Sequence, residues 1–411
     1  MSPRERVLRA FEFKESDRIP LDLSGHRSSG LSASVYPELR KAMGLKPAPI
    51  RIYDPVQQLA VLHEDMLDIL GIDTIELGRA FATDDIDWRP WTLPNGTDCF
   101  LPRWVNPERE EKRWIIRSKS GRIIAQMPDG AQFFEQIWYP FFDENSDRSD
   151  IEAAMEESMW HTVVSPPGPL TDGPEGEKLL KKSAEQLRQS TDRAIIGLFG
   201  GNLLETGQML YRNDQFLLML AMDPPGVHDF LDRLVEIHLE NLERFLKAVG
   251  NNIDIVLFGD DLGMQSGPQM SPEMYREYFK PRHQLMWAKA KKLADVKVML
   301  HCCGGVRELL PDLIDAGLDT INPVQFTARG METEQLKKDF GKEIVFWGGG
   351  CDTQQILPNG TPDEVYDHVK EQLEILTPDG GFVFQQVHNI LPEVPPENIL
   401  AMFSSVRDFK Y

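Results

Sequence analysis

The 411-residue sequence contains only four cysteines, at positions 99, 302, 303 and 351, and two of them are adjacent. So few cysteines, placed in this way, argue against a disulfide framework. They are typical of a reducing compartment, where thiols stay free for metal binding or chemistry. We therefore expect a cytoplasmic protein.

Long hydrophobic runs are also absent. No apolar run approaches the roughly 20 residues that a helix needs to cross a bilayer. The opening residues, Met1–Arg6, lead into an amphipathic helix and lack the apolar core of a signal peptide. Neither membrane insertion nor export is therefore expected.

Basic residues are in short supply: 44 lysines and arginines face 65 acidic residues, for a net charge of −21. Nucleic acids and anionic membranes are bound by basic surfaces, so neither is an expected partner. The hydrophobic content of 41% is ordinary for a globular protein and supplies a large core. A soluble enzyme with a small-molecule substrate fits this balance.

What the sequence does contain is a series of short apolar, β-branched runs separated by helical segments. Such alternation indicates a parallel sheet, and eight units indicate closure into a (β/α)8 TIM barrel, an α/β fold spanning residues 1–411. The expected strands are Ile19–Leu23, Ile72–Leu77, Ala194–Phe199, Ile253–Phe258, Lys297–His301, Thr320–Val324, Ile344–Trp347 and Phe382–Gln385.

Several helices are marked by clear start signals. Ser271-Pro272 and Thr361-Pro362 each place an N-cap residue before a proline at the first helical position. The expected helices are Pro3–Phe13, Pro272–Ala294, Val306–Ala316, Glu332–Phe340, Pro362–Leu376 and Ile399–Val406.

Residues 80–193, between the second and third expected strands, do not fit a plain barrel. They hold six of the eight tryptophans and two turn signals, Pro94-Asn95-Gly96 and Lys119–Arg122. The second turn separates Trp114–Arg117 from Ile123–Gln126, which predicts an antiparallel hairpin. We expect an antiparallel β-rich insertion followed by helix, with a turn at Pro166–Glu177. It is either a plain subdomain or a lid over the barrel mouth.

Catalytic groups of a barrel project from the carboxyl ends of its strands and the loops just beyond. This rule selects candidates strand by strand. They are Asp22, His26, Arg27, Glu76, Arg79, Glu205, Asp260, Asp261, His301, Cys303, Asn322, Gln325, Cys351, Asp352, Gln386, His388 and Asn389. Among them we assign His26, Asn322, Gln325, Gln386 and Asn389, together with Trp347, to substrate binding.

The strongest cluster is His301-Cys302-Cys303 at the end of the fifth expected strand. Side chains alternate along a strand, so His301 and Cys303 share one side and Cys302 faces the other as a small buried residue. An imidazole and a thiolate are good zinc ligands, and His388 or Cys351 can supply a third. The alternative is a metal-free pocket in which His301 acts as a proton donor.

Asp260 and Asp261, flanked by glycines, place two carboxylates at the end of the fourth strand. Paired acids there bind a cation or transfer protons, unless one merely caps a turn. We assign catalytic roles to Asp261, Asp260, Glu76 and Arg27. An aspartate of the pair also suits a contact that orients a histidine ligand.

These residues lie within longer motifs that resemble one family. Five segments are similar to the uroporphyrinogen decarboxylase and cobamide methyltransferase superfamily. They are the opening segments Arg4–Val7 and Asp17–Pro20, and the later segments Leu300–Gly305, Trp347–Thr353 and His388–Ile399. The resemblance covers about 1–80 and 194–411 and is poor across the insertion. It implies a TIM barrel and often a homodimer.

The superfamily contains two kinds of enzyme. The decarboxylases carry an arginine-rich opening segment, of which this sequence retains Arg27, and an aspartate where the second strand here offers Glu76. The resemblance to the zinc methyltransferases is carried by His301 and Cys303, with His388 in the segment where those proteins have a cysteine ligand. Cys351 is the alternative source of that thiolate.

The resemblance therefore implies a zinc-dependent methyltransferase or demethylase component. It would move a methyl group between a small methylated substrate or thiol and a corrinoid carried by a separate protein. A metal-free lyase (decarboxylase) is the alternative, and a non-catalytic corrinoid- or tetrapyrrole-binding protein is a third reading.

Overall fold

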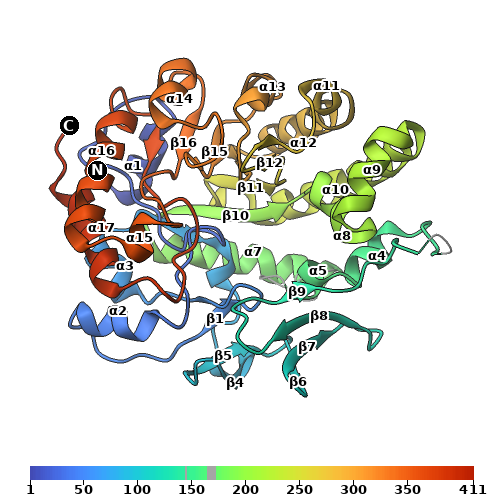
Figure 1. Cartoon of the computed structure of the whole chain (residues 1–411), viewed down its shortest axis with the longest axis horizontal. Helices are drawn as coiled ribbons and strands as arrows, with labels where there is room; N and C mark the ends of the chain where they lie inside the picture. The colour runs from blue at the N-terminus through green and yellow to red at the C-terminus, as the bar shows by residue number, and fades with distance from the viewer. Residues whose placement is uncertain (144–145, 164–172) are drawn as a thin grey trace.

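A parallel sheet of seven strands forms the centre of the protein, and helices surround it (Figure 1). The structure, a computed structural model, describes residues 1–143, 146–163 and 173–411. The strand order is β17-β16-β15-β14-β11-β10-β3, with every pairing parallel. The bounds are β3 Thr74–Glu76, β10 Ala194–Gly200, β11 Ile255–Gly259, β14 Lys297–His301, β15 Thr320–Asn322, β16 Val345–Trp347 and β17 Phe382–Val383. This curled α/β sheet confirms seven of the eight expected strands.

The expected first strand, Ile19–Leu23, does not form a strand. Its centre makes an isolated bridge, Leu21 with Phe384, and the Asp22 N–H donates to the Phe384 carbonyl over 2.9 Å. On its other side the Asp73 N–H donates to the Leu21 carbonyl over 2.8 Å. Pro20 lacks an N–H, and the Leu21 N–H donates to the Asp73 carboxylate rather than to a strand. The segment thus links the two edge strands with few backbone hydrogen bonds.

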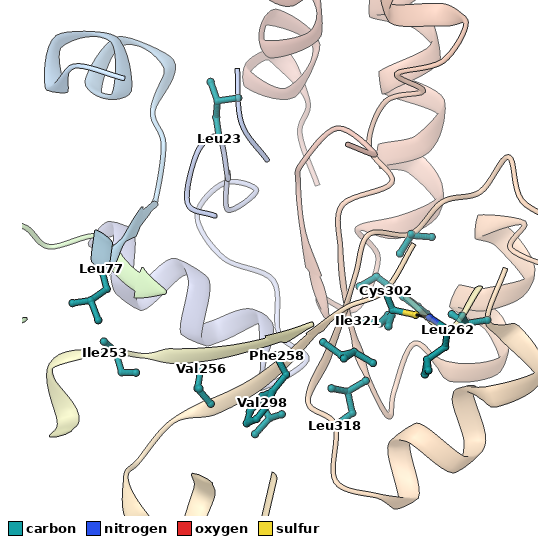
Figure 2. Close-up of a cluster of buried hydrophobic side chains, with 14 of the residues drawn as sticks. Leu23, Leu77, Ile253, Val256, Phe258, Leu262, Val298, Cys302, Leu318 and Ile321 are labelled. Carbon is teal, nitrogen blue, oxygen red and sulfur yellow. Dashed lines mark hydrogen bonds between the residues drawn. The ribbon is translucent and has the colours of Figure 1, made fainter. Parts of the chain in front are cut away.

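The two faces of the parallel sheet have different neighbours. One face packs in a small hydrophobic cluster, here called the inner cluster, which includes Ile196, Ile255, Leu257 and Met299. Alternate residues, including Val256, Phe258, Val298 and Ile321, belong to the main core between sheet and helices, part of which Figure 2 shows. This is the period of two that extended strands impose. The same alternation decides where each candidate side chain points.

Helices cover the outer face of the sheet, and Val7 and Ala10 of α1 cap the inner cluster. The helices on the amino-terminal half are α1 Pro3–Ala10, α2 Tyr36–Ala42, α3 Glu64–Leu70, α4 Ile151–Glu156, α5 Met159–Val163, α7 Gly173–Ser190, α8 Leu204–Tyr211, α9 Asn213–Met222 and α10 Pro224–Val249. Those that follow are α11 Pro272–Met274, α12 Lys280–Leu293, α13 Leu310–Asp315, α14 Thr333–Phe340, α15 Ile356–Asn359, α16 Pro362–Leu376 and α17 Pro396–Asp408. None of the helices in the described part of the chain is long and apolar enough to cross a membrane.

The single helix predicted over Pro272–Ala294 is interrupted. A π-helical turn, Tyr275–Phe279, separates α11 from α12. Pro281 lies at the start of α12, where its missing N–H cannot close an ordinary helical hydrogen bond. The prediction of a continuous helix was therefore wrong at this proline, whereas α16 matches its predicted bounds.

Among the described residues between β3 and β10, six antiparallel strands form two small sheets, β4-β5 and β6-β7-β8-β9, below the parallel sheet in Figure 1. Their bounds are β4 Trp88–Thr92, β5 Asp98–Pro102, β6 Glu108–Glu110, β7 Arg113–Arg117, β8 Ile123–Pro128 and β9 Glu135–Gln136. The predicted hairpin is β7-β8, in which Trp114 pairs with Met127. Of the predicted turn at 166–177, residues 166–172 lie outside the described residues, and 173–177 begin α7.

Two short antiparallel pairs complete the described strands. The pair β1 Ile52–Asp54 and β2 Leu59–Ala60 follows α2, and the pair β12 Gly263–Met264 and β13 Gly267–Pro268 follows β11. The backbone of Arg51, next to β1, bridges to Phe100 of β5. The insertion is therefore connected to the amino-terminal part of the chain.

Candidate metal centre

Three potential metal ligands converge at the carboxyl end of the parallel sheet. The ligand atoms of His301, Cys303 and His388 all lie within 4.8 Å of one another. His301 is the last residue of β14, two positions beyond Met299 of the inner cluster, so its ring faces inward. The Cys303 Sγ lies 3.4 Å from His301 Nε2, and the His388 ring lies 5.9 Å from that of His301. Two imidazoles and one thiol are donors typical of zinc.

Cys302 lies on the opposite side of the chain, as alternation predicted. It is completely buried in the outer core, and its Sγ accepts a hydrogen bond from the Leu262 N–H over 3.2 Å (Figure 2). It is thus a packing residue, as we expected.

Asn322 orients the His301 ring. Its amide nitrogen donates to the Trp347 carbonyl and to Gln385 Oε1, over 3.1 and 2.8 Å. The Asn322 Oδ1 therefore faces His301 Nδ1, 2.9 Å away, and can only accept a hydrogen bond. This contact places the ring proton on Nδ1 and leaves the lone pair of Nε2 directed toward Cys303. A partner of this kind fixes tautomer and orientation in metal-binding histidines.

A buried polar network extends from Asn322 to the segment that precedes α2. Gln385 Oε1 lies 3.1 Å from His26 Nε2, which lies 3.2 Å from Asp22 Oδ2. The Trp347 indole donates to the same Asp22 oxygen over 2.8 Å. Burial alone would raise the pKa of Asp22, but hydrogen bonds from His26, Thr74 and Trp347 lower it. The network holds an anionic carboxylate behind the histidines.

His26 and Trp347 were predicted to bind substrate. Both side chains are completely buried and already hydrogen-bonded within this network. Sequence reasoning did not select Gln385 or Ser28. The Ser28 Oγ lies 3.2 Å from His301 Nε2. The only sequence signal for Ser28 is its position two residues after the candidate His26.

The acidic side of the site is formed by Asp261. Its Oδ1 accepts the Cys303 N–H over 2.7 Å and lies 3.8 Å from His301 Nε2. Asp260 instead is fully buried and accepts the N–H groups of Leu204 and Glu205 at the start of α8. The structure therefore brings Asp261 to the candidate metal ligands and uses Asp260 as a helix cap.

Burial shifts the titration of the three donors. It lowers the pKa of His301, and together with the neighbouring imidazoles of His301 and His26 it lowers the pKa of His388 to about 3. Burial and the Asp261 carboxylate raise the pKa of Cys303. Both imidazoles are therefore neutral at pH 7, the form in which histidine binds a metal.

Cys351 does not join this group in the described part of the chain. It is completely buried, burial raises its pKa, and its Sγ contacts the Asp352 carbonyl at 3.8 Å. Three of the predicted substrate-binding amides instead hold backbone. Asn389 and Gln386 bond to Gly30 and Ser29, and Gln325 Oε1 accepts the Gly304 N–H.

Glu76 and Arg27 lie in a second buried cluster. Glu76 is 3% exposed, and its Oε1 has no hydrogen-bond partner among the described residues. Burial raises the pKa of Glu76 to about 7, although Arg27 and Arg79 act in the opposite direction. Arg27 Nη1 lies 3.6 Å from Asp54 Oδ2. A buried polar atom without a partner costs about 1–3 kcal/mol, so Glu76 Oε1 needs an explanation.

The fold and the donor set together define an α/β protein with a candidate metal centre at the carboxyl edge of a curled parallel sheet. A model of the uroporphyrinogen decarboxylase (URO-D) family matches residues 162–409, more than half of the chain. The chain therefore belongs to the uroporphyrinogen decarboxylase family.

Two proteins from Methanosarcina mazei that resemble this chain are methyltransferases. A methylated-thiol–coenzyme M methyltransferase is 28% identical over 149 residues, which span 36% of this chain and 36% of that protein. A solved structure of a methyltransferase superposes with a TM-score of 0.59, covering 99% of both chains at 17% identity. At that identity the second likeness shows the fold alone.

Proposed function

We propose that this protein is a methyltransferase or demethylase component whose zinc ion is bound by His301, Cys303 and His388. It would transfer a methyl group between a small methylated substrate or thiol and a corrinoid held by a separate protein. The observation that carries this proposal is the convergence of two imidazoles and one thiol within 4.8 Å, at the edge where barrel enzymes place their catalytic groups.

The side chains around the donors fit a metal ion. Asn322 leaves the lone pair of His301 Nε2 free, and burial keeps both imidazoles neutral. Asp261 adds a negative charge beside the cluster, which favours a divalent cation. When bound, zinc would supply a Lewis acid that stabilises a thiolate or polarises the leaving group of a methyl donor.

One comparison, that with the curated relative, favours methyl transfer over decarboxylation. The curated relative acts on methylated thiols and coenzyme M, as its name states. A porphyrinogen decarboxylase must also grip several substrate carboxylates with cations. Here Arg27 faces Asp54, and Arg79 donates to the Leu62 carbonyl. Both arginines thus already have partners, which disfavours the lyase alternative.

We extend the proposal to the remainder of the chain. The Pro20–Asp22 segment would serve as the eighth position of a (β/α)8 barrel, because it bonds to both edge strands. The antiparallel insertion within 80–193 would act as a lid over the mouth or as a surface for the corrinoid protein. A homodimer is the proposed assembly.

Metal analysis of the purified protein tests the proposal. We expect about one zinc per chain in the wild type and strong depletion in His301→Ala and His388→Ala. Methyl transfer, followed by the absorbance of a reduced corrinoid mixed with a methylated donor, should fall with the metal. Cys351→Ala is the matched control, because it removes a buried thiol outside the cluster.

The expected control result is a full zinc content in Cys351→Ala. A wild-type protein without metal, with His301 and Cys303 intact, would contradict the proposal. So would unchanged zinc in both histidine variants. Metal-free turnover with release of carbon dioxide would favour the lyase.

A further inference from the structure

Glu76 occupies the inner wall of the sheet on a different strand from the metal donors. It is the last residue of β3, and in the sheet register it pairs with Ile196, a member of the inner cluster. Paired residues of neighbouring parallel strands point to the same face, so Glu76 points inward. Its position at the carboxyl end of β3 corresponds to that of His301 at the end of β14.

His26 connects the two sites electrostatically. Its ring centre lies 6.4 Å from that of His301, and its charge influences the pKa values of both His301 and Glu76. Glu76 and His301 therefore both lie within electrostatic range of the same imidazole.

The Glu76 carboxyl has unused hydrogen-bonding capacity. Its Oε1 is buried and has no partner among the residues that the structure describes. The two arginines that act on its pKa have other contacts, since Arg27 faces Asp54 and Arg79 donates to the Leu62 carbonyl. A carboxyl buried in this way gains from a bound molecule that shares its proton or accepts it.

The groups around Glu76 both favour and oppose its charge. Burial raises its pKa to about 7, so that at neutral pH a large fraction is protonated. The ionisable groups that act on it, or on which it acts, are Arg27, Arg79, His26, Asp54 and Tyr53. A pKa near 7 is the value at which a carboxylic acid gives and regains a proton most readily in neutral solution.

We propose that Glu76 is the proton donor to the leaving group of the methyl donor, and that this donor is a methyl ether. This inference rests on the proposed methyl transfer. The Glu76 O–H would point at the ether oxygen while the methyl group faces the incoming corrinoid nucleophile. Glu76 would then be a catalytic residue in direct contact with substrate.

The proposed step transfers the methyl group to the corrinoid and one proton to the leaving oxygen. The electron pair of a reduced corrinoid, carried by the partner protein, forms a bond to the methyl carbon. The carbon–oxygen bond breaks, and its electron pair goes to the oxygen, which takes the Glu76 proton and leaves as an alcohol or phenol. Glu76 becomes a carboxylate and regains a proton from solvent.

An acid at this position discriminates among methyl donors. Thiols have a pKa of about 8.5 and phenols about 10, and simple alcohols are far less acidic. A thiolate therefore leaves without protonation more easily than a phenoxide or an alkoxide. A buried neutral carboxyl contributes little to demethylation of a thioether and much to that of an ether.

The test uses the zinc-loaded protein with reduced cobalamin as acceptor and two probes, 2-methoxyphenol and dimethyl sulfide. Glu76→Gln keeps the shape and a hydrogen-bond donor but cannot give a proton. We expect the rate with 2-methoxyphenol to fall about 100-fold or more, the usual contribution of a general acid. The rate with dimethyl sulfide should change less than threefold, and zinc content should not change.

The pH profile separates proton donation from a structural role. The wild-type rate with 2-methoxyphenol should decline as the pH rises above about 7, since the acid must be protonated. The Glu76→Gln rate should lack that decline. Glu64→Gln, the same substitution at a largely exposed residue of α3, should behave as wild type. Equal losses with both probes, or a rate with 2-methoxyphenol within twofold of wild type, would overturn the proposal.

Binding provides a readout that does not depend on turnover. Glu76→Leu removes the hydrogen bond, and calorimetry should show 2-methoxyphenol binding weakened about tenfold with zinc content unchanged. Unchanged binding would overturn the contact between Glu76 and the ether. If wild type binds 2-methoxyphenol through Glu76 but demethylates neither probe, the proposed methyl transfer fails and the contact stands.

Discussion

The inner and outer faces of β14 and of the residues that follow it each carry one cysteine, and the two cysteines have different surroundings. On the inner side, His301 and Cys303 meet His388 and are oriented by Asn322. On the outer side, Val298 and Cys302 are completely buried against the helices. One chain position separates a candidate ligand from a packing thiol. Alternation along a strand, rather than residue type, thus divides chemistry from stability here.

The sharpest test of this division compares the two adjacent cysteines. Cys303→Ala should weaken zinc binding on the order of 1,000-fold or more, since losing a residue that only orients a ligand already costs about 10–100-fold. Cys302→Ala should leave zinc binding within about twofold and lower the free energy of unfolding by about 1 kcal/mol. Competition with a chromogenic chelator measures the first effect, and urea unfolding measures the second. Equal zinc loss in both variants would break the comparison.

Removal of a large side chain on the outer face should greatly lower the free energy of unfolding and leave zinc binding unchanged. Phe346 of β16 is completely buried in the outer core. Phe346→Ala should lower the free energy of unfolding by about 3–5 kcal/mol, because it opens a cavity. Its side chain belongs to the outer core and not to the face that carries the candidate metal ligands, so the folded variant should bind zinc as wild type does. Weakened zinc binding in the folded variant would show that the two faces are coupled.

The histidines of the two layers also differ. His238 of α10 lies in the outer layer, where its Nε2 lies 3.1 Å from the Asn202 carbonyl, and burial lowers its pKa to about 4. The unfolded chain takes up this proton below about pH 6.5, whereas the folded protein does not until about pH 4. The contribution of His238 is thus complete above pH 6.5 and declines by about 3 kcal/mol as the pH falls to 4.

Replacement of His238 tests that contribution. Unfolding free energies measured between pH 4 and 7 should vary less in His238→Gln than in wild type, with zinc binding at pH 7 unchanged. His228→Gln, at a partly exposed histidine, is the control and should keep the wild-type dependence. A His238→Gln profile parallel to that of wild type would remove this residue from the acid sensitivity.

A smaller effect on zinc binding than that of Cys303→Ala is expected at the residue that orients His301. Asn322→Leu removes the oxygen that accepts the His301 Nδ1 proton and should weaken zinc binding about 10–100-fold. Asn322→Asp, which keeps an acceptor, should lose less. Chelator competition at pH 7 measures both variants. Wild-type affinity in Asn322→Leu would mean that the orientation of His301 is set elsewhere.

Local patterns in the sequence predicted much of this arrangement. The period of two assigned His301 and Cys303 to one side and Cys302 to the other, and apolar runs located seven parallel strands. The family resemblance directed attention to the segment that contains His388. Each of these inferences depends on short-range geometry or on an extended motif.

Other features depend on contacts between distant residues and had no local signal. Leu21 fails to form a strand because its N–H donates to Asp73, 52 positions away. Asp260 caps α8, which begins more than 50 residues earlier in the chain. Gln385 makes hydrogen-bond contacts with Asn322, His26 and Ser28, although no sequence motif predicts them. Only the folded chain shows these partners.

X-ray absorption spectroscopy at the zinc edge of the purified wild-type protein tests the central claim most directly. Ligation by His301, Cys303 and His388 predicts a first shell with one sulfur, at about 2.3 Å, and two imidazole nitrogens, at about 2.0–2.1 Å. Any further ligand would be nitrogen or oxygen. A shell with two sulfurs would bring in Cys351 or Cys302, and a shell without sulfur would remove Cys303; either result would contradict the account.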